Sequence, residues 1–551
     1  AAAYAARDAG RPVEGRTWMI AAANPHAVLA GADVLRAGGS AADALVAVQL
    51  VLGLVEPQSS GLGGGGFLVW WDAATATLTT LDGRETAPQA ATPRLFQDAD
   101  GAPLGFFDAV VGGLSVGAPG TPALLGEAHR RWGVRPWADL IAPAIALAEA
   151  GFPVSPRLAA LVAGDAERLG RFPATAAYFL PGGAPLAPGA ILTNPAYAET
   201  LRLLARDGAG AFYDGPIAAD IAQVVQSAPG NPGLLTEGDL ALYRVKERPP
   251  VCIAYRVFQV CGMGPPSSGA LTLGQILGML NTRDLAALGP GDPQAWRLIG
   301  DASRLAFADR GTYIADSDFV PVPLRGLLDP TYLRDRARAL DGDDALPEVR
   351  AGMPPWDHSL LLAPDASPER PSTTHVTIVD AAGNVASMTA SIENAFGSRL
   401  MVGGFLLNNQ LTDFSFRSHA DGVPIANAVQ PGKRPRSSMA PTIVLRDGRP
   451  VLALGSPGGS RIIGYVAKTI IAWADWDMDI QTAVSLPHAV NRFREFDLEV
   501  GTGAEALIPG LTALGYTAAA RELNSGLHAI EIGAVLKGAA DPRREGIALG
   551  D

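Results

Sequence analysis

The chain has 551 residues, of which 48% are hydrophobic and 18% are charged, with 43 Lys and Arg against 55 Asp and Glu and a net charge of -12. This composition excludes disorder as the general state, and the length is enough for roughly three or four ordinary domains or one large layered fold. A negative balance with no basic run argues against nucleic acid and anionic membranes as partners, because both are bound by clustered Lys and Arg. The longest apolar stretch, Ala44–Val55, is shorter than the roughly 20 residues that span a bilayer, so no transmembrane segment is expected.

The N-terminal segment AAAYAARDAGRP lacks a charged region followed by a hydrophobic run, so no secretory signal is expected within this chain. From residue 24 to about residue 340, Ala and Leu recur at helical spacing, which predicts a mostly helical region. Gly38 and Gly39 are expected to end one helix there, and Ser40 with Asp43 to form a capping box at the start of the next.

The two cysteines, Cys252 and Cys261, are too few for a disulfide framework or a four-thiolate zinc site. They lie in VCIAYRVFQVCG, which predicts a hairpin that turns near Tyr255 and Arg256. Two small buried thiols are the favoured interpretation, and a disulfide across the hairpin is the alternative.

A tract rich in Asp and Pro, residues 341–372, has little periodicity and predicts an exposed, extended connector. The segments THVTIVD and NVASMTASI, which follow it, predict two strands joined by a short turn. Two more strands are expected at Pro441–Arg446 and Pro450–Gly455, with the dipeptide DG between them as a tight turn. After Gly458 and Gly459, RIIGYVAKTIIAWADWDMD predicts a helix that begins on glycines, whose free N–H groups suit an anion. The pattern as a whole predicts an α+β fold with helices outside and sheets inside.

Most familiar catalytic motifs are missing. Gly61, Gly63 and Gly66 have the spacing of a dinucleotide-binding loop, but a helical run precedes them and a strand-like FLVWW follows, so tight backbone packing is the favoured role. The seven histidines show no metal-ligand spacing, and there is no GxSxG elbow. No cofactor and no metal are expected.

The junction of Ser372, Thr373, Thr374 and His375 remains, where the Pro-rich connector runs directly into the best strand. If the peptide bond before Thr373 were cut, that residue would combine an alcohol nucleophile with a free α-amine, whose pKa near ~8 makes it a competent base. From spacing alone, the segment TTHVTIV is equally explained as an ordinary β-strand with Thr on its solvent-exposed face.

Several ordered motifs resemble the γ-glutamyltransferase family of N-terminal-nucleophile hydrolases, and the resemblance covers nearly the whole chain. The motifs before the junction are DGRETAP (82–88), GAPG (117–120), PPSSG (265–269) and FADRGTYIADSDFVPVPLRGLL (307–328). Those from the junction on are STTHVTIVDAAGNV (372–385), LLNNQLTDFS (406–415), KRPRSSMAPT (433–442) and GSPGGSRI (455–462).

The resemblance implies an αββα sandwich built from two intertwined subunits that one precursor yields by cutting itself. The cut would fall between Ser372 and Thr373, giving a large subunit of residues 1–372 and a small subunit of residues 373–551. Thr373 would act as nucleophile on its own upstream peptide bond and then on the substrate, with Thr374 as the second-ranked candidate. Ser391 matches a family Thr that hydrogen-bonds the nucleophile's hydroxyl.

The resemblance also implies a γ-glutamyl substrate such as glutathione, with an amino acid, a dipeptide or water as acceptor. The α-carboxylate needs a cation and hydroxyls, and the α-ammonium needs acceptors. The matching positions for the carboxylate are Arg84, Ser437 and Ser438. Those for the ammonium are Glu393, Gln410 and Asp413. The family's oxyanion hole matches Gly458 and Gly459, whose backbone N–H groups would stabilise the developing negative oxygen. Most family members are periplasmic or secreted, and no cofactor is implied.

Two alternatives and one structural expectation accompany this hypothesis. A glutaryl or cephalosporin acylase would keep the fold and change the acyl group, and a non-catalytic binding protein would keep only the scaffold. Between Asp413 and Ser437 some bacterial relatives carry a lid with an aromatic residue, whereas here the only aromatics are Phe414 and Phe416. A more open acyl site is therefore predicted.

Overall fold

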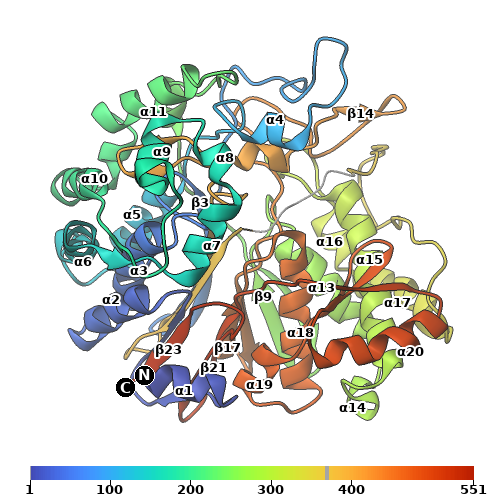
Figure 1. Ribbon diagram of the computed structural model, residues 1–551. Helices are drawn as coiled ribbons and strands as arrows, with labels where there is room; N and C mark the ends of the chain where they lie inside the picture. Colours follow the sequence, from blue (N-terminus) through green and yellow to red (C-terminus); the bar gives the residue numbers. More distant parts are fainter. Residues whose placement is uncertain (1, 366–371) are drawn as a thin grey trace.

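The computed structural model describes residues 2–365 and 372–551 and is built around two seven-stranded antiparallel sheets (Figure 1). The first sheet has the order β23 (Ile547–Gly550), β2 (Met19–Ala22), β10 (Thr374–Val379), β11 (Val385–Ser391), β3 (Gly65–Asp72), β4 (Thr77–Gly83) and β7 (Lys246–Arg248). The second has the order β1 (Val13–Gly15), β22 (Leu536–Ala540), β21 (His528–Ile532), β17 (Arg449–Gly455), β16 (Thr442–Arg446), β9 (Phe258–Gly262) and β8 (Val251–Tyr255).

Helices cover the outer face of each sheet. The helices over the first sheet include α2 (Pro25–Arg36), α3 (Ala41–Val55), α5 (Thr121–Trp132), α6 (Trp137–Ala150), α7 (Pro156–Gly164) and α10 (Pro195–Asp207). Those over the second include α13 (Gly269–Leu280), α15 (Pro293–Tyr313) and α18 (Ile462–Ala474). A separate apolar core, with Met19, Val69, Ile443 and Ile530 among its members, fills the space between the sheets. The predicted αββα sandwich is therefore confirmed.

Local signals account for several of these elements. Ser40 and Asp43 form the predicted capping box of α3, with hydrogen bonds of 2.9 and 3.1 Å in the two directions. The predicted strands appear as β10, β11, β16 and β17, and the DG turn has both residues at positive φ, 51° for Asp447 and 72° for Gly448. Through residue 365 the connector contains no helix or strand beyond the short 3-10 turn that ends at Asp341, as expected. Residues 366–371 of that predicted connector lie outside the described residues.

The region from residue 24 to 340 is mostly helical, as predicted, and the strand-like FLVWW and the predicted cysteine hairpin lie in β3 and in β8 and β9. Strands β4 and β7 were not predicted, because TLTTLDG breaks the apolar alternation and KER has no apolar residue. One expectation needs correction. Cys252 and Cys261 are joined in a disulfide rather than left as two thiols, because β8 and β9 pair with these residues directly opposite each other.

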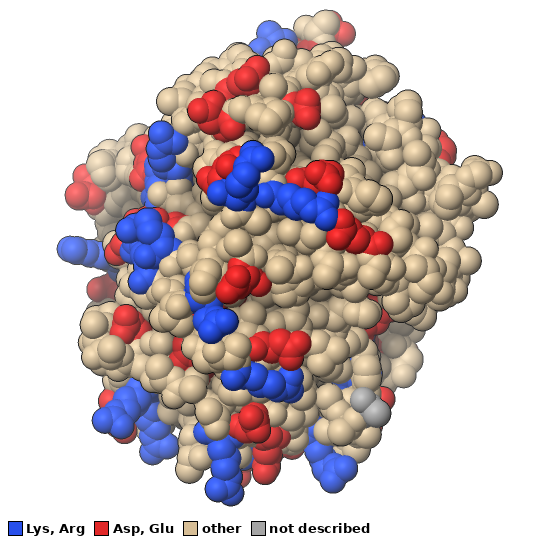
Figure 2. Space-filling view, turned by 90° about the vertical axis from the view of Figure 1, so that its left-hand side faces the viewer, with Lys and Arg blue, Asp and Glu red and all other residues tan. Residues whose placement is uncertain are grey.

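Charged residues of both signs are mixed on one face of the molecule. On the face shown in Figure 2, Lys and Arg alternate with Asp and Glu and do not gather into a basic patch. Among the described residues, no helix is long and apolar enough to span a bilayer.

Candidate active site

Thr373 lies at the entrance to the middle of the first sheet. It precedes β10 directly, and Ser391 ends the neighbouring strand β11, so the antiparallel register brings the two residues together. Thr373 Oγ1 donates to the backbone oxygen of Ser372 at 2.6 Å and lies 3.2 Å from Ser391 Oγ. Ser391 Oγ donates to the same Ser372 oxygen at 2.7 Å. The hydroxyl predicted as nucleophile is thus adjacent to the carbonyl that self-cleavage would attack.

The loop after β11 is held in an unusual backbone conformation. Glu393, Phe396 and Arg399 all have positive φ, at 76°, 64° and 65°, which non-glycine residues seldom adopt. The strain has a visible result, because the Glu393 N–H turns back and donates to Ser391 Oγ at 2.8 Å. The loop therefore fixes both the Ser391 hydroxyl and the Glu393 side chain.

A pocket in front of Thr373 collects nearly all of the predicted site residues. Its lining consists of Arg84, Thr373, Ser391, Glu393, Gln410, Asp413, Ser437, Ser438, Met439, Gly459 and Ile462. Two predicted residues are outside this lining: Gly458, directly before Gly459, and Thr374, the second-ranked nucleophile, which is buried in β10. Met439 and Ile462 are additions that sequence reasoning missed, because apolar residues carry no chemical signal by themselves.

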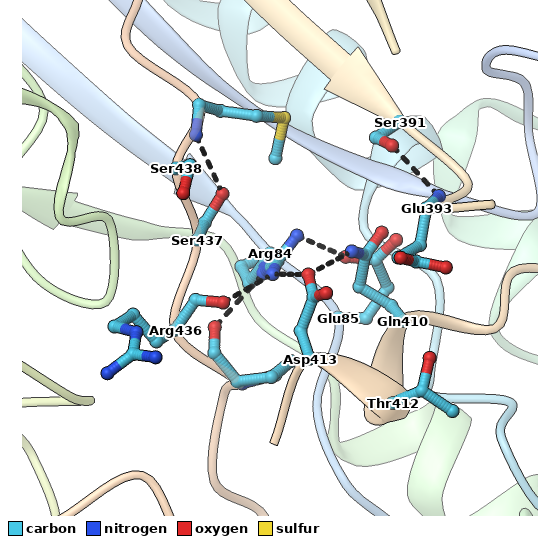
Figure 3. A network of polar contacts seen from close by, with 12 residues as sticks. Arg84, Glu85, Ser391, Glu393, Gln410, Thr412, Asp413, Arg436, Ser437 and Ser438 are labelled. Carbon is cyan, nitrogen blue, oxygen red and sulfur yellow. Dashed lines mark hydrogen bonds and ion pairs between the residues drawn. The ribbon is translucent and has the colours of Figure 1, made fainter. Parts of the chain in front are cut away.

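Arg84 and Asp413, which were expected to bind opposite ends of a substrate, bind each other. Arg84 Nη2 lies 2.6 Å from Asp413 Oδ2 and also donates to the backbone oxygen of Arg436 (Figure 3). Arg84 Nε donates to the backbone oxygen of Pro435. Arg84 Nη1 is hydrogen-bonded to none of the described residues and lies 4.0 Å from Glu85 Oε2. Nη1 is therefore the nitrogen of this guanidinium that keeps hydrogen-bonding capacity for a ligand.

Carboxyl groups outnumber cations around this arginine. Gln410 Nε2 donates to Asp413 at 2.7 Å, and Asn409 donates to the buried carboxyl of Glu393. Burial, reinforced by Asp413, raises the pKa of Glu393 well above its ordinary value. Burial also raises the pKa of Glu85 to about 8, with Arg84 opposing the shift. Burial thus favours the neutral form of Glu393 and of Glu85, and a cation placed beside Glu393 would oppose this shift in its pKa.

Two serines form the opposite wall of the pocket, and other motifs hold them. The backbone oxygen of Ser437 accepts hydrogen bonds from both the backbone N–H and the hydroxyl of Ser268, each at 2.7 Å. Arg310 Nη2 donates to Ser438 Oγ at 2.6 Å, and its Nε donates to Ser268 Oγ at 2.8 Å. The PPSSG and FADRG segments therefore act as the support that places Ser437 and Ser438.

The two glycines before α18 adopt backbone conformations that suit their predicted role. Gly458 and Gly459 have φ of 139° and 60°. Neither N–H donates to a backbone oxygen among the described residues. A side chain on Gly458 would also collide with Tyr465, since its Cβ would lie 2.6 Å from that ring. These N–H groups are available to an anion at the start of the helix.

The glycine-rich loop confirms the packing interpretation rather than the dinucleotide one. A Cβ on Gly63 would lie 2.0 Å from the Leu406 oxygen, and a Cβ on Gly64 would lie 2.2 Å from the Ser391 oxygen. The close approach of this loop to Leu406 and to Ser391 at the end of β11 therefore requires glycine at these two positions. Among the described residues, no group of His, Cys, Asp and Glu could hold a metal ion.

The span between Asp413 and Ser437 does not place an aromatic residue over the pocket. Phe414 is buried in a small apolar cluster, and the Phe416 ring stacks on Phe96 with 4.7 Å between centroids. Neither phenylalanine lines the pocket. The more open acyl site stays a prediction that this arrangement favours.

A threonine directly before a central strand of an αββα sandwich, with its hydroxyl beside the preceding carbonyl, is an arrangement typical of N-terminal-nucleophile hydrolases. The family model for Gamma-glutamyltranspeptidase matches residues 27–551. The glutathione hydrolase proenzyme of Bacillus subtilis (strain 168) is 39% identical over 97% of this chain and 92% of that protein. The acylase ACY 1 proenzyme of Pseudomonas sp. (strain SE83) is 35% identical over 92% of this chain and 88% of that protein. A cephalosporin acylase structure from Bacillus halodurans superposes with a TM-score of 0.86 at 25% identity, covering 98% of this chain and 97% of that one. The chain belongs to the gamma-glutamyltranspeptidase family of enzymes.

Proposed function

We propose that this enzyme cleaves γ-glutamyl amide bonds and passes the γ-glutamyl group to water, an amino acid or a dipeptide. One observation carries the proposal: Glu393 and Asp413 share the pocket of Thr373 with Arg84, Ser437 and Ser438. This set offers a cation and hydroxyls for an α-carboxylate and two carboxyl groups for an α-ammonium. A glutathione-like molecule has both groups at the end of its glutamyl chain.

Activity would begin with cleavage of the chain by itself. Thr373 Oγ would attack the Ser372 carbonyl carbon, and the C–N bond between Ser372 and Thr373 would break, which forms an ester and frees the Thr373 α-amine with the hydroxyl proton on it. Water would then hydrolyse the ester, which leaves a carboxylate on Ser372 and restores the Thr373 hydroxyl. The hydrogen bond from Ser391 to the Ser372 oxygen supports this step, because that oxygen becomes negative as the attack proceeds. The products would be subunits of residues 1–372 and 373–551, which stay together because β2 and β3 flank β10 and β11 in one sheet.

Turnover would then use the same hydroxyl. Thr373 Oγ attacks the γ-carbonyl, and the α-amine takes the hydroxyl proton and returns it to the departing nitrogen. The N–H groups of Gly458 and Gly459 would stabilise the oxyanion, a contribution of about 10²–10³ in rate for each donor. Arg84, Ser437 and Ser438 would hold the carboxylate, and Glu393, Gln410 and Asp413 the ammonium. No cofactor takes part in these steps.

The second candidate function is hydrolysis of glutaryl or cephalosporin side chains, which the likeness to acylases favours. A glutaryl group has the carboxylate but no ammonium, so it would bring no cation to Glu393, while Asp413 would keep Arg84 as its ion-pair partner. N-terminal sequencing and intact-mass analysis should first find Thr373 as a chain end. Comparing γ-glutamyl-p-nitroanilide with glutaryl-p-nitroanilide should then give the higher kcat/KM for the former. A clear preference for the glutaryl compound would assign the enzyme to the acylases, and a chain that stays uncut and inactive would leave only a binding role.

Periplasmic or secreted placement is part of the proposal. The Cys252–Cys261 disulfide supports it, since disulfides persist in oxidising compartments.

A further inference from the structure

An arginine near the C-terminus holds the residue that carries the nucleophile. Arg544 Nη1 donates a hydrogen bond of 2.9 Å to the backbone oxygen of Thr373. Thr373 is 4% exposed and Arg544 is 5% exposed, so water does not weaken the contact. Among the described residues, no other charged side chain is hydrogen-bonded to Thr373. Arg544 does not line the substrate pocket, so it acts on Thr373 from behind.

The turn that presents Arg544 is fixed in place. It joins β22 in the second sheet to β23 at the edge of the first, and it therefore crosses between the sheets. Arg7 Nη1 holds the backbone oxygen of Arg544 at 3.1 Å from the outside. Gly526 leaves room for the arginine stem, because a Cβ there would lie 2.9 Å from Arg544 Cδ and 2.7 Å from Pro457 Cγ. The stem thus runs past the loop that leads to Gly458.

The guanidinium is kept in an unfavourable place for a charge. Burial and the nearby Arg157 lower the pKa of Arg544 to about 9, while Glu56 and Asp541 oppose the shift. Glu56, at the end of α3, is itself buried, and neither of its oxygens accepts a hydrogen bond from a described residue. Arg544 forms hydrogen bonds only with the Thr373 oxygen and Asn524 Oδ1 through its side chain, among the described residues. Its charge is therefore not absorbed by a direct ion pair.

We propose that Arg544 is a positioning residue for the nucleophile: it holds the Thr373 carbonyl, and its charge keeps the α-amine that cleavage would create in the unprotonated form. The inference rests on the proposed function. In that reaction the hydroxyl proton of Thr373 moves to the α-amine while Oγ bonds to the substrate carbon, and it moves on to the leaving nitrogen while the C–N bond breaks. The amine must therefore start as a free base.

Distance supports the electrostatic part. The nitrogen and carbonyl oxygen of one residue are at most about 3.6 Å apart, so the guanidinium nitrogen lies within about 6.5 Å of the future amine. A positive charge at that range disfavours a second one, by about one pKa unit.

Other ionisable groups around Thr373 do not replace this charge. The carboxyl groups in the surrounding elements are Glu56, Glu393, Asp413, Asp541 and Glu545. The other cations are Arg84, Arg157 and Arg543. Arg84 is paired with Asp413, and Arg543 with Glu499 and Asp541. Burial lowers the pKa of His375 and His528, so both are neutral near pH 7.

The test is the pH profile of kcat/KM for γ-glutamyl-p-nitroanilide, measured on protein whose cleavage before Thr373 has been verified. The acid limb of this profile is the rise of kcat/KM with pH that reports deprotonation of the α-amine. Removing the charge in Arg544→Met should raise the pKa of the acid limb by about one unit. Activity should then be about tenfold lower below the limb, with a much smaller loss above about pH 9. Arg544→Lys should leave the limb in place. Arg7→Met, which removes a cation from the outside of the same turn, is the matched control and should also leave it in place.

A uniform loss of rate with an unmoved limb in Arg544→Met would overturn the inference, because a merely structural role lowers activity at every pH. If Arg544→Met is not cleaved, Arg544→Gln, which keeps a donor but no charge, takes its place. If neither neutral variant is cleaved while Arg544→Lys is cleaved, the positive charge is needed for self-cleavage. That result would equally overturn the proposed effect of the charge on the α-amine. A wild-type chain that is never cut would overturn the proposed function together with this inference, whereas a normally cut enzyme with an unmoved limb would overturn this inference alone.

Discussion

Ser391 offers the sharpest test of the proposed self-cleavage. Its hydroxyl donates to the Ser372 oxygen at 2.7 Å and accepts from the Glu393 N–H at 2.8 Å. The other donor to that oxygen is Thr373 Oγ, at 2.6 Å, and this bond is lost when Oγ becomes the attacking atom. Among the described residues, Ser391 is then the remaining donor to an oxygen that is becoming negative. Ser391→Ala should therefore slow cleavage by about 10²–10³-fold, which corresponds to about 2.7–4 kcal/mol.

The assay follows conversion of purified full-length chain into two subunits by intact mass and denaturing gels over time. Ser391→Thr restores a hydroxyl, and it should restore cleavage to within about tenfold of wild type. Thermal unfolding of the uncut variant should stay close to that of the uncut Thr373→Ala chain, which separates a chemical effect from a folding effect. Cleavage of Ser391→Ala at the wild-type rate would refute the reasoning, and so would a threonine variant no faster than the alanine one.

Three further predictions concern the pocket and the sheets. Glu393→Gln should lower kcat/KM for γ-glutamyl-p-nitroanilide by about 10–100-fold, because the substrate ammonium loses a charged partner. The same variant should change kcat/KM for glutaryl-p-nitroanilide by no more than about twofold. Equal losses on both substrates would contradict the assignment. The pKa of Glu85 is about 8 in the folded chain against an ordinary value of 4.5. The neutral Glu85 carboxyl therefore contributes fully to the free energy of unfolding below about pH 4.5, and this contribution is lost as the pH rises through 8. Glu85→Gln should therefore raise Tm relative to wild type more near pH 8.5 than near pH 5, and a constant difference would show that Glu85 is ionised throughout. Replacing Cys252 and Cys261 together by Ala should lower the free energy of unfolding by about 2–3 kcal/mol, because the disulfide closes a loop of sequence separation 9. The loss should appear as a fall in Tm of a few degrees, and kcat should stay unchanged because the hairpin does not line the pocket. An unchanged Tm would mean that the disulfide adds no stability.

The predictions that succeeded depend on neighbours in the sequence. The capping box at Ser40, the two strands that follow the connector and the helix that begins after Gly459 all follow from interactions within a few residues. Strand β7 was not predicted because it depends on pairing with β4, in which Arg248 lies opposite Thr80, 168 positions away. Strand β4 was not predicted because its segment TLTTLDG breaks the apolar alternation that would reveal a strand locally.

The sequence by itself determined the family and the set of polar residues that the pocket contains. These residues could be named because each stands in a short motif whose residue types and order are visible in the sequence. Only the tertiary structure decided how they are paired. Arg84 meets Asp413 across 329 positions, and Arg544 reaches the Thr373 oxygen across 171. Such contacts arise from the packing of two sheets against each other, and no local propensity encodes which arginine meets which carboxylate or carbonyl.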